Sequence, residues 1–88
     1  MARYNIYCRK YNIMARAYVT YIKIVETDDI YHEIGKIICN SLEKIENIRY
    51  TQPRASQEQC EELWRQRGYK KIADTLWRMD EKGEQNDL

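Results

Sequence analysis

Residues that build enzyme and metal sites are scarce in this 88-residue chain, which has one histidine, three glycines and three cysteines. His32 is the sole histidine, and the chain has neither a glycine-rich phosphate loop nor a serine in a nucleophile-elbow context. Cys8, Cys39 and Cys60 lie far apart, whereas structural zinc sites use ligands about two to four residues apart. We therefore expect no catalytic residue, no metal ion, no cofactor and no enzymatic activity.

Long apolar runs are also missing, and none approaches the ~18 residues needed to span a bilayer. The N-terminal segment MARYNIYCRK lacks an apolar core, so we expect no signal peptide. An odd number of widely spaced cysteines is not the pattern of a disulfide-stapled secreted domain. Together these absences predict a cytoplasmic protein without a membrane partner.

Strong turn residues are absent from the first part of the chain, because no glycine or proline precedes Gly35. Residues 3–9 alternate between apolar and polar side chains, and residues 13–26 are rich in β-branched and aromatic residues. We predict two strands joined by a turn at residues 10–12, where Asn12 tolerates the left-handed backbone of a tight reversal. The alternative is one continuous irregular stretch. Beyond Tyr21 the alternation fades, which indicates a bulge or burial on both faces.

Residues 28–47 have the clearest helical period, with six isoleucine and leucine side chains in a single stripe. Thr27 or Asp28 suits the start of this helix, and Asn47 suits its end. We expect the helix to lie across the sheet, because a stripe of this length must be buried against another apolar surface.

The second half of the chain predicts one short strand and two helices. Residues 48–52 are a candidate third strand, parallel to the second through a right-handed crossover. Ser56 and Gln59 have capping-box spacing, which predicts a helix over residues 57–67. A last helix is predicted over residues 69–82.

The predicted fold class is α+β, a two- or three-stranded sheet in the order β-β-α-β-α-α. One long helix and a C-terminal helical hairpin cover the sheet. Residues 1–83 form a single compact domain, and residues 84–88 form a frayed acidic tail. Trp64 and Trp77 are expected to be largely buried. The other predicted core residues are Ile6, Val19, Ile22, Ile24, Ile30, Ile34, Ile37, Ile38, Leu42, Ile45, Leu63, Ile72 and Leu76.

The net charge of +1 hides blocks of opposite sign. Residues 1–25 contain five basic residues and no acid, and residues 26–47 contain six acids and two bases. Residues 48–79 contain seven bases and four acids. Overall charge therefore predicts no partner, but the two basic regions are candidate contact surfaces.

The basic N-terminal region also contains five of the eight tyrosines. Stacking of tyrosine rings on bases, with arginine and lysine on phosphates, is typical of single-stranded nucleic-acid binding. The same residue types are enriched at protein interfaces, and a solvated strand face is a third interpretation. The candidate contact residues of this region are Arg3, Tyr7, Arg9, Lys10, Arg16 and Tyr18.

The C-terminal region resembles half of a helix-turn-helix unit. Its segment GYKKIADTL is similar to the I-A-x-x-L helix that precedes the turn in many DNA-binding domains, but no room remains for a recognition helix. Phosphate contacts that read no sequence stay open as a hypothesis, as does a plain amphipathic hairpin covering the sheet. The candidate phosphate-binding residues are Arg65, Arg67, Lys70, Lys71 and Arg78.

The leading hypothesis is a small non-enzymatic protein that binds nucleic acid through these basic, tyrosine-rich surfaces. The alternative is a stoichiometric inhibitor or adaptor of a host protein, similar in size and charge pattern to viral and mobile-element proteins such as anti-CRISPR proteins. Its contact surface would be acidic, formed by Glu33, Glu43 and Glu46 on the helix 28–47 together with residues 80–88. A homodimer formed through an open sheet edge is a further hypothesis.

Overall fold

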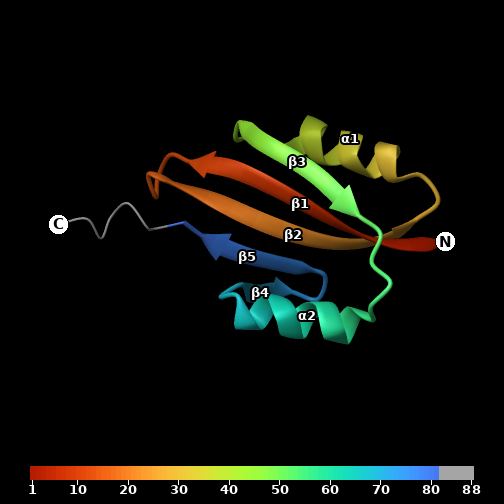
Figure 1. Cartoon of the computed structure of the whole chain (residues 1–88). Helices are drawn as coiled ribbons and strands as arrows, with labels where there is room; N and C mark the ends of the chain where they lie inside the picture. Colours follow the sequence, from red (N-terminus) through yellow and green to blue (C-terminus); the bar gives the residue numbers. More distant parts are fainter. Residues whose placement is uncertain (82–88) are drawn as a thin grey trace.

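The computed structural model describes residues 1–81, which form a five-stranded antiparallel sheet with two helices (Figure 1). The strand order is β3-β1-β2-β5-β4. The prediction of a two- or three-stranded sheet with one long helix and a C-terminal helical hairpin is therefore wrong. The elements in chain order are β1 (Ala2–Asn12), β2 (Ala17–Thr27), α1 (Ile30–Asn40), β3 (Ile45–Thr51), α2 (Gln57–Gln66), β4 (Lys70–Ala73) and β5 (Leu76–Asp80).

The hairpin of β1 and β2 is the centre of the sheet. Its two strands pair without a register shift from Ala2 opposite Thr27 to Asn12 opposite Ala17. The reversal lies at residues 13–16, later than the predicted turn at 10–12, because Asn12 is still paired. The Asn12 side chain accepts a hydrogen bond from the Ala15 amide (3.1 Å), and Arg16 adopts the positive φ of 54° that closes the turn.

Helix α1 ends at Asn40, well before the predicted end at residue 47. Asp29 caps its start, because the Asp29 carboxylate accepts a hydrogen bond from the His32 amide at 3.1 Å. Leu42 and Ile45 continue the helical spacing by coincidence: Leu42 is fully exposed and Ile45 begins β3. β3 pairs with β1 rather than with β2, and it runs in the same direction as β2 because both are antiparallel to β1.

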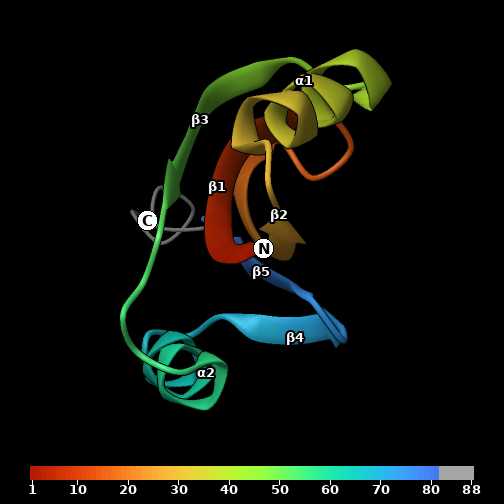
Figure 2. The same ribbon diagram turned by 90° about the vertical axis from the view of Figure 1, so that its right-hand side faces the viewer.

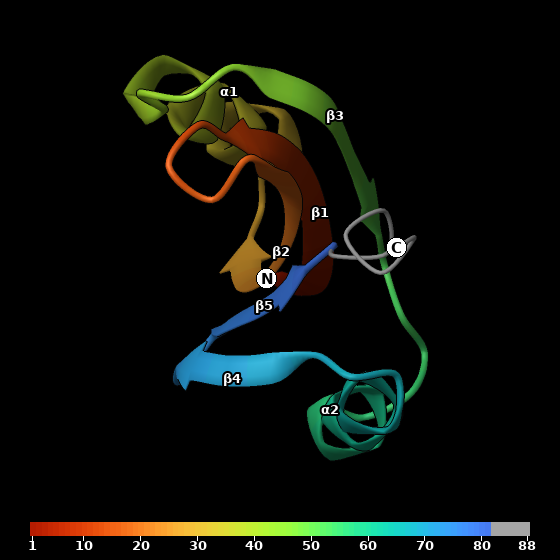
Figure 3. The same ribbon diagram turned by 90° about the vertical axis from the view of Figure 1, so that its left-hand side faces the viewer.

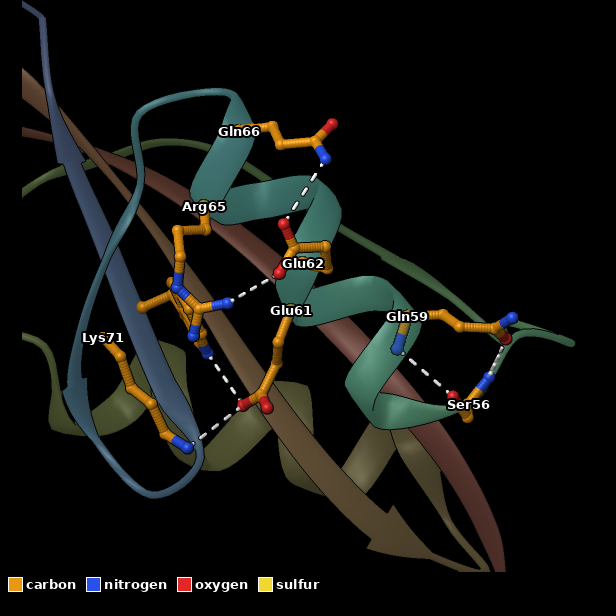
Figure 4. Close-up of polar contacts among 8 residues, drawn as sticks. Ser56, Gln59, Glu61, Glu62, Arg65, Gln66 and Lys71 are labelled. Carbon is orange, nitrogen blue, oxygen red and sulfur yellow. Dashed lines mark hydrogen bonds and ion pairs between the residues drawn. The ribbon is translucent and has the colours of Figure 1, made fainter.

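Helix α2 begins with the capping box that its sequence predicts. The Ser56 hydroxyl accepts from the Gln59 amide at 3.1 Å, and the Ser56 amide donates to the Gln59 side chain at 3.0 Å (Figure 4). The helix ends at Gln66, and Gly68 follows with a positive φ of 99°. Glycine suits this position because other residues rarely adopt such a backbone conformation.

The predicted helix over residues 69–82 is wrong, because residues 70–80 form the hairpin of β4 and β5. β5 pairs with β2, and amide hydrogen bonds from Ile24 to Thr75 and from Glu81 to Tyr18, both 2.9 Å, extend this pairing. The long β2 strand thus offers a template that outweighs the local helical spacing of this segment. The resemblance to a helix-turn-helix unit ends with it. Residues 82–88 lie outside the described residues, and so does the predicted acidic tail.

The two helices lie on opposite faces of the sheet (Figures 2 and 3). On the α2 face, Ile22 and Ile24 form a buried cluster with Trp64 and Trp77. On the α1 face, the buried apolar strand residues are Ile6, Cys8, Ala17 and Val19. Both faces of β2 are covered, which explains why apolar and polar residues no longer alternate beyond Tyr21. The pairing of β2 with β1 contains no bulge.

The core is smaller than the sequence predicts. Ile6, Val19, Ile22, Ile24 and Ile30 are buried as predicted, as are Trp64 and Trp77. The prediction is wrong for four other residues, which lie on the exposed sides of α1 and α2, in the bend after α1 or on the edge strand β4: Ile38, Leu42, Leu63 and Ile72. Ile34, Ile37, Ile45 and Leu76 are half-buried.

Candidate functional site

Tyrosine and arginine side chains gather on the α2 face of strands β1, β2 and β3. One row of this face runs across all five strands, because the register aligns Arg49, Tyr7, Ile22, Trp77 and Lys71. Helix α2 covers Ile22 and Trp77 in this row. Outside the part that α2 covers, toward β3 and toward the β1–β2 turn, this face of the sheet displays exposed and half-buried polar and aromatic side chains. We name this surface the tyrosine–arginine face, formed by Tyr7, Arg9, Tyr11, Tyr18 and Arg49.

The side chains of the tyrosine–arginine face are stacked as cation–aromatic pairs. The Arg9 guanidinium carbon lies 3.8 Å from the centre of the Tyr18 ring, and that of Arg49 lies 4.3 Å from the centre of the Tyr7 ring. Tyr11 meets Tyr18 edge to face, with ring centres 5.1 Å apart. Strand register produces these contacts: Arg49 is directly opposite Tyr7, and Tyr11 is opposite Tyr18.

Glu81 holds the Arg9 guanidinium in place. Arg9 donates through Nε to one carboxylate oxygen at 3.0 Å and through Nη2 to the other at 2.8 Å, a bidentate geometry. The hydrogen bonds from Arg9 lower the pKa of Glu81 below its ordinary value, and the hydrogen bond to Glu81 raises the pKa of Arg9. The ion pair fixes the plane of Arg9 over Tyr18 and cancels its positive charge.

Tyr69, which follows the end of α2, lies beside this face. Tyr69 packs against the buried cluster beside Tyr7, and its amide donates to the Trp64 carbonyl at 3.0 Å. Burial raises the pKa of Tyr69 and so does Tyr7, while Arg49 and Arg67 act in the opposite direction. Arg49 and Arg67 therefore both lie within electrostatic range of the same hydroxyl.

A half-buried carboxylate, that of Glu61, joins α2 to the sheet beside this face (Figure 4). One oxygen of Glu61 accepts from the buried Trp77 indole at 3.0 Å and lies 3.4 Å from Lys71 Nζ. Burial of Glu61 acts to raise its pKa, but hydrogen bonds from Trp77, Gln57 and Lys71 outweigh burial and lower it. The Trp64 and Trp77 rings meet edge to face, 5.8 Å apart.

Three of the predicted contact residues, Tyr7, Arg9 and Tyr18, are brought together by the structure. Arg3 points from the same face of β1 but lies at its far end, where it donates to the Ala55 carbonyl. Arg16 is exposed in the hairpin turn, where it adopts a positive φ.

The remaining predicted contact residues are dispersed. Lys10 and Arg78 lie on the α1 face beside the Tyr21 ring, and Lys70 is opposite Arg78 in the register. Arg65 is paired with Glu62 at 3.0 Å. Lys71 pairs with the half-buried Glu61 described above. Among the five described C-terminal cations, Arg67 alone acts electrostatically on Tyr69 beside the tyrosine–arginine face, so the two predicted basic regions do not form one surface.

Sequence reasoning missed Arg49 and Tyr11 as members of this face. Tyr11 was placed in the predicted turn, although its odd number continues the alternation of Tyr7 and Arg9. Arg49 lies in the segment correctly predicted as a strand, but only the pairing of β3 with β1 brings it to Tyr7. Knowledge of the strand order was therefore required.

Searches against protein-family models, curated proteins and solved structures find no match for this chain. Among residues 1–81, no three histidine, cysteine or acidic side chains are grouped closely enough to hold a metal ion. No helix in that same range has the length and apolar character needed to cross a membrane.

Proposed function

We propose that the protein binds single-stranded nucleic acid on the tyrosine–arginine face. The observation that carries this proposal is the pair of stacks, Arg9 on Tyr18 and Arg49 on Tyr7, on adjacent strands of an open sheet. A base that lies on the outer side of either guanidinium extends a stack of ring, cation and base. Such stacking tolerates any base, because every base has a π-face.

The charge pattern favours stacking over phosphate neutralisation as the source of affinity. Arg9 is neutralised by Glu81, which leaves Arg49 and Arg67 as the cations at this surface without an ion-pair partner among the described residues. Two phosphate contacts on a single strand would give a salt slope of about −1.4 and a loss of affinity of roughly sevenfold between about 50 and 200 mM salt. This dependence is shallow for a nucleic-acid-binding protein.

The form of the surface favours single strands over duplexes. Duplex reading needs an element that enters a groove. The segment that resembles a helix-turn-helix unit, residues 68–76, instead belongs largely to the hairpin of β4 and β5. A sheet that displays tyrosines and arginines suits unpaired bases, which are free to leave their own stack.

The test is the affinity of variants for a labelled single-stranded oligonucleotide, measured by fluorescence anisotropy. Tyr18→Ala removes the ring beneath Arg9, and we expect a loss of roughly 5- to 150-fold, the range for one base–aromatic stack. Arg49→Ala is expected to weaken binding and to make the salt slope shallower by about 0.7. Arg54→Ala is the matched control, because Arg54 is exposed and lies outside the face. Equal affinities of all four proteins would refute the proposal.

The second candidate function is binding of a protein partner at the β3 edge. This function is compatible with the hypothesis of an inhibitor or adaptor. Within residues 1–81, β3 is paired on one side by β1, so its other backbone edge is open to a strand from a partner or from a second copy. The acidic version of this hypothesis loses its basis, because Glu33, Glu43 and Glu46 belong to α1, a turn and β3 rather than to one helix. Amides of neighbouring strand residues point to opposite edges, so a proline in place of Asn47 in one variant and of Ile48 in another removes one outward-facing amide and weakens such pairing. Unchanged association in both variants would exclude this candidate.

A further inference from the structure

A cavity of about 380 Å³ lies between α1 and the sheet, on the face opposite the tyrosine–arginine face. The apolar part of its sheet side is formed by Ile6, Cys8 and Leu76, and its helix side presents Ile37. The cavity exists because α1 packs loosely: Ile30 is its one buried residue, although Ile34, Ile37 and Ile38 continue its apolar stripe. Its volume is within the range of small-molecule pockets, roughly 300–1,000 Å³.

Three lysines line this cavity from three different elements: Lys10 on β1, Lys23 on β2 and Lys36 on α1. Lys36 lies 3.5 Å from Glu33, the acidic residue of the lining. Lys10 and Lys23 have no ion-pair partner among residues 1–81, and Lys10 Nζ lies 5.4 Å from the centre of the Tyr21 ring. An apolar pocket with two unpaired ammonium groups is complementary to a ligand that is apolar along its body and negatively charged at one end.

We propose that this cavity binds a small amphipathic carboxylate, with its hydrocarbon part between Ile37 and Leu76 and its carboxylate at Lys10, which lies four ladder positions along the sheet from the pair of Lys23 and Ile6. An uncharged apolar ligand would leave the Lys10 ammonium group unpaired at the rim. A cationic ligand would be repelled by it. The bound hydrocarbon would cover the half-buried stripe of α1, which the sheet leaves open. This site is independent of the tyrosine–arginine face and of the function proposed for it.

The test is a titration of the labelled protein with decanoate, followed by two-dimensional amide NMR. Decyltrimethylammonium, which has the same alkyl chain and the opposite charge, is the matched ligand. We expect saturable decanoate shifts at Ile6, Ile37 and Leu76, and binding of the cation at least tenfold weaker. The double variant Lys10→Met with Lys23→Met is expected to lose this preference. Lys44→Met is the control for loss of one exposed lysine outside the cavity lining.

A variant that fills the cavity separates pocket binding from surface adsorption. Ile37→Trp places a larger ring in the space, and we expect it to abolish decanoate binding while the dispersion of the amide spectrum is kept. If Ile37→Trp unfolds the protein, the lysine variants decide alone. Equal affinities for decanoate and the cation would overturn the proposal. Absence of decanoate shifts at the cavity residues, or shifts confined to the tyrosine–arginine face, would also overturn it.

Discussion

Replacing Glu61 with alanine tests how α2 is held on the sheet. Trp77 is 1% exposed, and its indole N–H donates to Glu61 at 3.0 Å. Without that acceptor, the buried donor has no partner, which costs about 1–3 kcal/mol. The loss of the contact with the partly exposed Lys71 adds little, and the better helix propensity of alanine offsets a few tenths of a kcal/mol. We expect a net destabilisation of about 1–3 kcal/mol.

Urea unfolding followed by tryptophan fluorescence measures this change, because both tryptophans of the chain lie at the interface of α2 and β5. In thermal unfolding, each kcal/mol corresponds to a shift in Tm of about 4–8 °C for a domain of this size. Glu62→Ala is the matched control. It removes the neighbouring carboxylate, which is 59% exposed and pairs with Arg65 on the helix surface. Its expected effect is below about 0.5 kcal/mol.

The Glu61→Gln variant separates charge from hydrogen bonding. Its side-chain carbonyl can still accept from Trp77, so it should be more stable than Glu61→Ala. Because the folded-state pKa of Glu61 is lowered, its charge contributes stability above the unfolded pKa of about 4.3, and this contribution disappears as the pH falls through the folded pKa. The difference between wild type and Glu61→Gln should therefore shrink in acid. Equal stabilities of Glu61→Ala and Glu62→Ala near neutral pH would refute the proposed role of Glu61.

Three further predictions follow from local geometry. Ser56→Ala removes the α2 cap and should cost about 1 kcal/mol in the free energy of unfolding, measured by urea titration; an unchanged midpoint would contradict the capping box. Iodoacetamide should modify the exposed Cys39 before Cys8, which is 4% exposed and whose pKa is raised by burial; mass-spectrometric mapping with Cys8 modified first would argue against the packing of β1. Glu81→Gln should free the charge of Arg9, strengthening oligonucleotide binding and steepening its salt slope by about 0.7 in anisotropy titrations; weaker binding would contradict this and show that the orientation of Arg9 by Glu81 matters more than the charge that Glu81 cancels.

Local signals in the sequence identify the β1–β2 hairpin and α2. Alternation reveals both strands, and the spacing of Ser56 and Gln59 identifies the helix start. The predicted extension of α1 to residue 47 and the predicted helix over residues 69–82 are wrong for the same reason. In residues 41–47 and 70–80, apolar side chains recur at a spacing that suits a helix, while β1 and β2 each offer a free edge to pair with. Pairing between residues far apart in sequence decides these segments, and local periodicity contains no record of it.

The sequence predicts only part of the tyrosine–arginine face. Alternation along β1 and β2 placed Tyr7, Arg9 and Tyr18 on one side, as the structure shows. The contribution of Arg49 depends on the order of strands, and the charge of Arg9 depends on Glu81, which is 72 residues away in sequence. Sequence composition therefore overstates the positive charge of this face.

The decisive measurement is the affinity of the wild-type protein for a labelled single-stranded oligonucleotide and for a duplex of the same sequence, at about 50 and 200 mM salt. Binding on the tyrosine–arginine face predicts that the single strand binds more tightly and loses only about sevenfold between the two salt concentrations. Tighter binding of the duplex, or no binding of the single strand at tens of micromolar protein, would contradict nucleic-acid binding on this face.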